Sequence, residues 1–290
     1  MIRPLAPLKK YGVVVFDYIQ RYVSELFTDV LWGFERDGFF PLVREAECVM
    51  CTTPSTLRDA IEYAGVADSK TRLLPFVFDP DPLLQVGDNL PPPAHNYLLW
   101  VTNQSVHKNH TRVFQALANY YQYYNGKLDT VVIGMSEAFA WGDEESDRQL
   151  KAIPHLKTCL NVLHSNPILK EKVHFMGNVS DIEYANILQS ACFLLHPNLA
   201  DNGTFCVLEA AYMGKPSLSA RYAQMEYINS LGNLNMLFCD PYAAKDIAAQ
   251  LSQMEKQYRA IPLPSRTELD ALHWRCKAGY SFELIRKLID

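Results

Sequence analysis

The feature that most constrains the fold is a regular alternation of short apolar segments with helix-compatible segments over residues 97–240. The series begins with the strand-like YLLWVTN (97–103) and DTVVIGM (129–135), which are separated by a helix-compatible stretch. Such alternation predicts βαβ units and therefore a parallel sheet. Four further strand candidates follow, at 172–179, 192–198, 216–220 and 235–240. We therefore predict an α/β fold in which residues 97–265 form a complete doubly wound parallel sheet.

The first 80 residues predict a smaller α/β unit. Its strand candidates are GVVVFDYI (12–19), CVMCTT (48–53) and LLPFVF (73–78), with a helix-compatible stretch between the first two. About three strands would struggle to bury both faces of a parallel sheet. We therefore expect an incomplete Rossmann-like domain over residues 1–80, either because opening strands are missing or because another chain supplies them.

Two further segments complete the expected domain organisation. Residues 81–96 are rich in proline and lack periodicity, which is typical of a linker between domains. Residues 266–290 have the pattern of one or two closing helices, which we expect to pack back on the first domain.

Composition and charge exclude several classes of function. The formal net charge of −5 gives no general attraction to nucleic acid. No segment approaches the roughly 20 apolar residues of a membrane-spanning helix, and the first residues lack the apolar core of a secretory signal. The seven cysteines favour free thiols in a reducing compartment. We therefore expect the cytoplasm as the location.

Two motifs suggest metals but fit structural roles better. Cys48 and Cys51 form a CxxC within a strand candidate, where positions three apart point to opposite faces. Asp79 and Asp81 form a DxD at a strand exit, without further convergent oxygen ligands nearby in the sequence. We expect no metal site at either motif.

The segment ADNGTFCVLEAAYMGKP (200–216) carries the clearest chemistry. It joins a strand candidate to a helix-compatible stretch, so its turn lies at the sheet edge where ligands bind in open α/β folds. Gly203 would let the backbone approach an anion closely. The negative charges of Asp201 and Glu209 would repel a nearby phosphate. Their presence is therefore favourable only if they bind another group, such as sugar hydroxyls. The alternative is that Asp201 caps the helix and Glu209 is a surface acid.

Two other segments end at the same predicted edge. In VTNQSVHKNH (101–110), Lys108 precedes a helix and could neutralise a phosphate, although a solvated loop lysine fits equally well. In GNVSD (177–181), Ser180 or Asp181 would cap the next helix, and the main chain could hydrogen-bond the edge of a base.

In order and spacing, these three segments resemble the nucleotide-sugar-binding half of retaining GT-B glycosyltransferases of family 4, the glycosyl transferases group 1. The resemblance covers residues 97–226 and rests on Lys108-Asn109, the FMGNVSD block and the two acids followed by Gly-Lys-Pro. It implies a GT-B fold of two Rossmann-like domains. VVVFDYIQRYV resembles a strand of the acceptor-side domain, with Asp17 retained and Phe16 where histidine is frequent. The chain then resembles an N-terminally shortened member.

The resemblance also implies roles for individual residues. Lys108 would contact the donor diphosphate, Glu209 the ribose hydroxyls, and Asp201 the donor sugar, as a shorter replacement of the family's first glutamate. Asn103 stands where an arginine often binds phosphate. The implied catalytic residues are Lys108, Asp201 and Asp17, and the implied donor-binding residues are Asn103, Lys108, Asn178, Asn202, Gly203, Thr204, Phe205 and Glu209. Of these, the amides of 203–205 would cradle the distal phosphate.

The function implied is transfer of a hexose from a nucleotide-diphosphate sugar to a glycan or lipid-linked acceptor, with retention, in surface polysaccharide synthesis. No cofactor, metal or nucleic-acid partner is expected. The implied partners include the cytoplasmic face of the inner membrane, through a peripheral contact. A GT-B-fold nucleotide-sugar epimerase and an inactive nucleotide-sugar-binding module remain alternatives.

Overall fold

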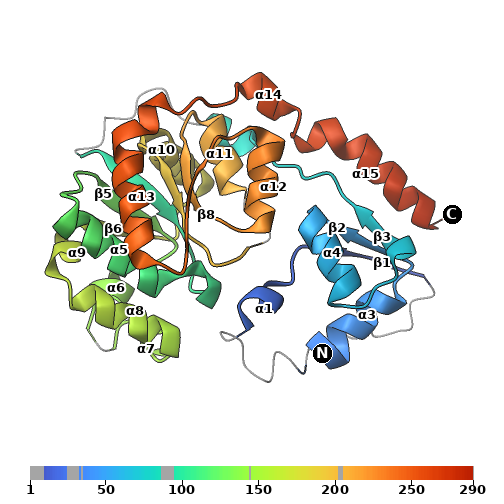
Figure 1. Ribbon diagram of the computed structural model, residues 1–290, viewed down its shortest axis with the longest axis horizontal. Helices are drawn as coiled ribbons and strands as arrows, with labels where there is room; N and C mark the ends of the chain where they lie inside the picture. Colours follow the sequence, from blue (N-terminus) through green and yellow to red (C-terminus); the bar gives the residue numbers. More distant parts are fainter. Residues whose placement is uncertain are drawn as a thin grey trace. The chain divides into compact units, whose positions relative to one another are not determined.

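The computed structural model describes residues 10–24, 33, 35–85, 95–143, 145–201 and 205–289 (Figure 1). The chain divides into two compact units. Unit 1 comprises Met1–Phe78, Ala200–Gly203 and Asp270–Asp290, and unit 2 comprises Asp79–Leu199 and Thr204–Leu269. Each unit contains its own parallel sheet.

Unit 2 contains a six-stranded sheet in the order β6-β5-β4-β7-β8-β9, in which all neighbouring strands run parallel. The order reverses direction at β4, the first strand in sequence, as it does in a doubly wound fold. This confirms the predicted complete sheet. The strands are β4 (Tyr97–Val101), β5 (Asp129–Ile133), β6 (Val173–Gly177), β7 (Leu194–His196), β8 (Ser217–Ala220) and β9 (Leu237–Cys239).

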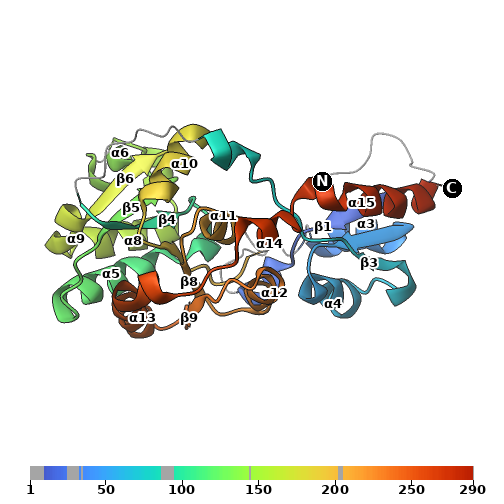
Figure 2. The ribbon, with the colours of Figure 1, turned by 90° about the horizontal axis from the view of Figure 1, so that it is seen from above.

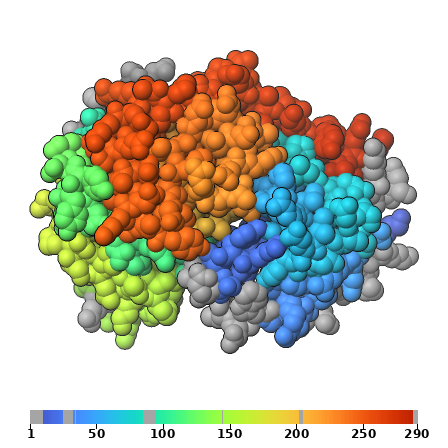
Figure 3. Space-filling view, viewed as in Figure 1, coloured from blue at the N-terminus to red at the C-terminus, as the bar shows by residue number. Residues whose placement is uncertain are grey.

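Helices cover both faces of this sheet. α5 packs against α13 and α8 on one face, while α11 packs on β7 and β8. Figure 2 shows α10 on the opposite side of the sheet from α5 and α13. In Figure 3 the orange and red-orange side chains of α12 and α13 form part of the near surface of the unit, beside green and yellow-green segments. The helices are α5 (His110–Tyr123), α6 (Glu137–Trp141), α7 (Arg148–Lys151), α8 (Pro154–His164), α9 (Pro167–Lys172), α10 (Asp181–Ser190), α11 (Cys206–Tyr212), α12 (Ala223–Gly232), α13 (Ala244–Gln257) and α14 (Arg266–Asp270).

The core of unit 2 forms between the central strands and the α5 side. Trp100 of β4 is fully buried and meets Phe114 of α5 edge-on, with ring centroids 5.5 Å apart. Burying an aromatic side chain of this size contributes about 2–3 kcal/mol relative to leaving it exposed. The packing fixes the starting point of α5 beside the carboxyl end of β4, where the loop carrying Lys108 lies.

Unit 1 contains a three-stranded parallel sheet in the order β1-β2-β3. Its strands are β1 (Gly12–Val15), β2 (Cys48–Cys51) and β3 (Thr71–Leu73), and α4 (Pro54–Glu62) packs on β2 and β3. Its other helical segments are α1 (Ile19–Tyr22), η2 (Glu35–Phe39), α3 (Phe40–Glu45), η3 (Asp68–Lys70) and α15 (Trp274–Ile289).

One strand of unit 1 differs from the sequence prediction. The third strand is Thr71–Leu73, not residues 73–78, because pairing with β2 aligns Met50 with Arg72. Beyond it, Phe78 makes an isolated bridge to His273. Phe78 donates its N–H to Leu272 and accepts from Trp274, at 3.1 Å each, which ties the end of the first segment to the start of α15. None of the described helices is long and apolar enough to cross a bilayer.

Candidate functional site

The candidate site lies at the carboxyl edge of the unit 2 sheet, where one asparagine joins three loops. Asn109 follows β4 and adopts a left-handed φ of 65°. Its side-chain amide donates to the carbonyls of Pro197, after β7, and Pro241, after β9, at 3.1 and 2.8 Å. In this backbone conformation the Asn109 side chain reaches both carbonyls at once. Asn109 therefore fixes the loops after β4, β7 and β9 relative to one another.

Lys108 occupies the centre of this arrangement. It ends the short 3₁₀ helix η5 (Val106–Lys108) and is only 8% exposed. The preceding His107 accepts the N–H of Leu199 at 2.9 Å, which joins the β4 loop to the β7 loop through the backbone as well. The interpretation of Lys108 as a solvated loop lysine is therefore wrong. Lys108 is therefore held within the fold at this edge, where a lysine can bind an anion.

The residue after Asn109 is a buried neutral histidine. The ring nitrogen Nε2 of His110 lies 3.0 Å from the hydroxyl of Thr102. Burial lowers the pKa of His110 to about 3, and the neighbouring His155 and Lys108 act in the same direction. His110 therefore stays uncharged at neutral pH and adds no second positive charge beside Lys108.

The side chains of Asn103, which is exposed, and Gln104, which is half-buried, both hydrogen-bond to backbone groups of nearby loops. The side-chain oxygen of Asn103 accepts the N–H of Ser105 at 2.9 Å, and the amide of Gln104 donates to the Gly134 carbonyl at 3.0 Å. Gly134 has a φ of 93°, and a Cβ there would collide with the carbonyl oxygen of Thr102. The glycine therefore lets the loops after β4 and β5 approach each other.

Glu209 forms a second polar centre, on α11. Its Oε2 accepts a hydrogen bond of 2.6 Å from the hydroxyl of Tyr184 on α10. Burial raises the pKa of Glu209, while the Tyr184 bond acts in the opposite direction. Burial, together with the nearby Glu209 charge, also raises the pKa of Tyr184 well above its ordinary value. The interpretation of Glu209 as a surface acid is wrong, because its carboxylate is half-buried and held in one orientation.

Tyr184 was not predicted from the sequence, because its position depends on the start of α10. Ser180 and Glu183 form a reciprocal capping box that begins this helix at Asp181, which confirms the predicted cap. Tyr184 then lies in the first turn and faces α11. The capping box was visible in the sequence, but the contact with a residue 25 positions away was not.

A buried polar pair follows β7. The amide Nδ2 of Asn198 lies 3.0 Å from Nε2 of His196, and Nδ1 of His196 lies 3.2 Å from the Ser219 hydroxyl. With the amide donating to Nε2, the proton of a neutral imidazole resides on Nδ1. Asp201, three residues after Asn198, is 6% exposed. In the sequence, this pair could have been suspected only from two polar residues, His196 and Asn198, at the end of an apolar strand.

The family match decides the class of protein. Residues 86–268 match the family described as Glycosyl transferases group 1, which is more than half of the chain. The chain belongs to the group 1 glycosyltransferases. No curated protein sequence matches it.

Solved structures of other glycosyltransferases share the fold. Sucrose-phosphate synthase from Thermosynechococcus elongatus is similar with a TM-score of 0.71 and 16% identity, over 97% of this chain and 68% of that one. HepE from Anabaena in complex with UDP and glucose gives a TM-score of 0.70 and 14% identity, over 96% and 72%. A glycosyltransferase from Rickettsia africae gives a TM-score of 0.64 and 13% identity, over 89% and 67%. At these identities the likeness establishes the fold alone, and it confirms the predicted GT-B architecture of two Rossmann-like domains.

The loop expected to hold the distal phosphate is only partly described in this glycosyltransferase. Asn202, Gly203 and Thr204 lie outside the described residues. Phe205 is the residue before α11; its side chain is 47% exposed and its carbonyl accepts the N–H groups of Leu208 and Glu209. The helix begins at Cys206.

Asn178 follows β6 and is exposed. The preceding Gly177 has a φ of 66°, accepts the N–H of Gly134 at 2.7 Å and donates to the Met135 carbonyl at 2.9 Å. The loops after β5 and β6 are therefore joined by backbone bonds, and the main chain around Asn178 stays at the edge where the sequence predicted a contact with a base.

The predicted residues of unit 1 have local structural roles. Asp17 accepts the N–H of Ile19, the first residue of α1, at 3.2 Å. Cys48 and Cys51 are both buried free thiols in β2. Burial raises the pKa of Cys51 to about 12, so this thiol stays protonated at neutral pH.

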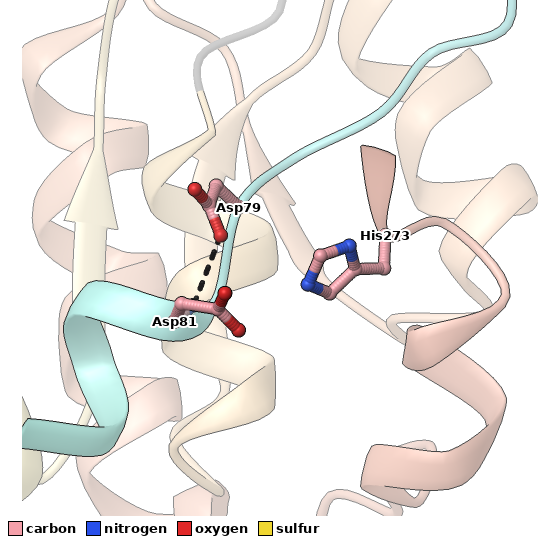
Figure 4. Close-up of side chains that lie close together, drawn as sticks. All are labelled: Asp79, Asp81 and His273. Atoms are coloured by element: carbon pink, nitrogen blue, oxygen red, sulfur yellow. Dashed lines mark hydrogen bonds between the residues drawn. The ribbon is translucent and has the colours of Figure 1, made fainter. Parts of the chain in front are cut away.

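The DxD motif forms a turn. Asp79 Oδ1 accepts the backbone N–H of Asp81 at 3.1 Å, the dashed line in Figure 4, and this bond starts the 3₁₀ helix η4 (Asp81–Gln85). The third side chain drawn there, His273, belongs to unit 1. A turn closed by an aspartate side chain on the backbone N–H two residues later is one that aspartate favours.

Proposed function

We propose that unit 2 binds a nucleotide-diphosphate sugar at the carboxyl edge of its sheet, and that the enzyme transfers the hexose to a glycan or lipid-linked acceptor with retention at the anomeric carbon. The observation that carries the proposal is the buried Lys108 at that edge, in a chain of the group 1 family. Open α/β sheets bind ligands there. The related fold of HepE was solved with UDP and glucose bound, which supports a donor of this class.

Each polar centre has a part in this proposal. Lys108 would contact the diphosphate, and Asn109 would hold it there through the loops after β7 and β9. Glu209 would accept the ribose hydroxyls while Tyr184 keeps its carboxylate in place. Asp201 would meet the donor sugar, and Asp17 would serve on the acceptor side. A donor-site carboxylate is a good partner for sugar hydroxyls because it accepts hydrogen bonds only.

Catalysis in this proposal is mainly electrostatic. Negative charge grows on the departing diphosphate in the transition state, and a fixed positive group that is already in place stabilises this charge without reorganisation. Lys108 supplies such a group because it is buried and its loop is tied down. We further propose a cytoplasmic enzyme of surface polysaccharide synthesis that contacts the membrane peripherally through its acceptor.

Lys108→Ala tests the assignment of roles. Removing one pre-positioned group of this kind typically costs about 100-fold or more in turnover. The measurement is the rate of nucleotide release from a donor shown to bind, with the folded state checked by circular dichroism.

The matched control is Lys157→Ala, which removes an exposed lysine of unit 2 on α8. We expect this control to keep the wild-type rate. Wild-type turnover in a folded Lys108→Ala enzyme would show that the assignment is wrong.

A further inference from the structure

A second concave site lies in unit 2, at the edge of the sheet opposite the candidate donor site. Here the residues that precede β4, β5 and β6 meet the end of α13 and the following 3₁₀ helix η6 (Tyr258–Ala260). They line a groove of about 550 Å³. We call it the amino-edge groove. Its basic side chains are Lys127, Lys172, Lys256 and Arg259, and its acidic ones are Asp129 and Glu255.

The two carboxylates of the groove already have partners within the fold. Asp129 pairs with Lys172 at 3.0 Å and with His174 at 3.1 Å. Glu255 accepts the hydroxyl of Tyr120 at 2.7 Å and the backbone N–H of Lys127 at 3.0 Å. The ion pair neutralises Asp129, whereas Glu255 keeps its negative charge because its two donors are neutral. Lys127, Lys256 and Arg259 therefore outnumber the one carboxylate of the groove that has no cationic partner among the described residues.

Three basic side chains of the groove therefore have no carboxylate partner among the described residues. Lys127 and Lys256 are exposed at the wall of the groove, and neither forms an ion pair with another described residue. Arg259 donates from Nε to the Tyr258 hydroxyl at 3.0 Å, and its guanidinium lies 5.3 Å from the centre of that ring. The aromatic contact orients the guanidinium and leaves its terminal nitrogens for another acceptor.

Arg259 and Tyr258 also line an adjoining hollow of about 410 Å³. This hollow lies before β7 and β8 and contains Lys215, whose pKa burial lowers. Arg259 thus lines both hollows, and the second contains a further lysine.

We propose that the amino-edge groove binds a phosphate-bearing ligand, held by Lys127, Lys256 and Arg259. Phosphate oxygens suit this set because lysine acts as a point charge and the arginine fork bonds two oxygens side by side. The phosphate could belong to a soluble ester or to a lipid headgroup. The proposal does not rest on the proposed glycosyl transfer, since the two sites lie at opposite ends of the strands and share none of these residues.

The test is calorimetric titration of the whole chain with inorganic pyrophosphate at low salt. In Lys127→Ala/Lys256→Ala we expect affinity to fall by about tenfold or more, because two charge-assisted contacts are lost. The charge-matched control is Lys157→Ala/Lys170→Ala, which removes two exposed lysines outside the groove and should change affinity less than about twofold. Lys108→Ala reports any binding at the donor edge and should leave the groove's affinity unchanged.

Two results would overturn the proposal: absence of pyrophosphate binding to the wild-type chain, or equal affinity in Lys127→Ala/Lys256→Ala and its control. Loss of all binding in Lys108→Ala would also overturn it, because the ligand would then occupy the opposite edge. Co-sedimentation with phosphatidylglycerol vesicles separates the sources. Vesicle binding that disappears in Lys127→Ala/Lys256→Ala supports a lipid headgroup, and binding no greater than to phosphatidylcholine supports a soluble ligand.

Discussion

At the scale of single residues, the candidate donor site depends on side chains held by neighbours rather than on isolated charges. Glu209 is oriented by Tyr184, and Lys108 is buried in a loop tied down by Asn109. In such sites a hydrogen bond to a charged group contributes about 1.5–3 kcal/mol. The positioning groups can therefore be tested separately from the groups they position.

Tyr184→Phe tests the orientation of Glu209. We expect the KM for the donor to rise about fivefold to tenfold with a smaller change in kcat, because the variant loses one hydrogen bond to a carboxylate used in binding. Steady-state kinetics with varied donor measure both constants. Tyr123→Phe is the control, since Tyr123 is 75% exposed. A KM equal to that of wild type would show that Tyr184 does not position Glu209 for the donor.

His110 predicts a pH dependence of stability. Its pKa is lowered from about 6.5 to about 3 in the folded state, so the unfolded chain binds the proton more readily. The free energy of unfolding therefore falls as pH drops below about 6.5, and the loss continues toward pH 3. We expect His110→Gln to flatten this part of the profile by about 1 kcal/mol or more.

Urea denaturation of wild type and His110→Gln between about pH 7 and pH 4 measures this effect as a difference, so that other titrating groups cancel. His95→Gln, at an exposed position, should keep the wild-type slope. Parallel profiles for wild type and His110→Gln would contradict the account.

The residue scale also shows where sequence reasoning stops. The importance of Lys108 and Glu209 was predicted because their place in the strand-and-helix order resembles a known family. Tyr184, His196 and Asn198 were missed because their roles depend on partners brought close only by the fold. Hydrogen bonds between residues far apart in the sequence leave no local pattern to detect.

At the scale of elements, the six strands of unit 2 could be predicted because each is a short apolar run between helical stretches. The third strand of unit 1 was placed too late, over 73–78. The observed β3 pairs Thr71, Arg72 and Leu73 with β2. Hydrogen bonding to β2 therefore determined where this strand lies more than the hydrophobicity of residues 73–78 did. Pro75 lies within the predicted run and has no N–H for a ladder bond.

The side-chain bonds of Asn109 should stabilise the loops after β4, β7 and β9 together. Asn109→Gly keeps the left-handed backbone but loses the side-chain bonds to the Pro197 and Pro241 carbonyls and the bond accepted from Arg112, so we expect a loss of about 1–3 kcal/mol. Asn109→Ala should cost about 1 kcal/mol more, because its Cβ is strained at a φ of 65°. Chemical denaturation measures both variants.

Asn125→Gly is the matched control, because Asn125 is exposed and has a similar φ of 53°. We expect its stability to stay within about 0.5 kcal/mol of wild type. Equal effects of Asn109→Gly and Asn125→Gly would mean that the two carbonyl bonds do not hold the loops together.

At the scale of the whole molecule, the matched family region coincides largely with unit 2, which contains Lys108 and Glu209. A ligand that binds only the folded state stabilises it by about 2.7 kcal/mol at a concentration 100 times its Kd. For a domain the size of unit 2 this corresponds to a rise in Tm of roughly 5–10 °C. Donor binding can therefore be detected before the acceptor is known.

The most direct test of the donor site is a thermal-shift screen of nucleoside diphosphates and their sugars. We predict that at least one raises the Tm of the wild-type chain by roughly 5–10 °C. The same ligand should raise the Tm of Lys157→Ala equally and give little shift in Lys108→Ala. A screen in which no nucleotide or nucleotide sugar shifts the wild-type Tm would contradict a donor site at the carboxyl edge of unit 2.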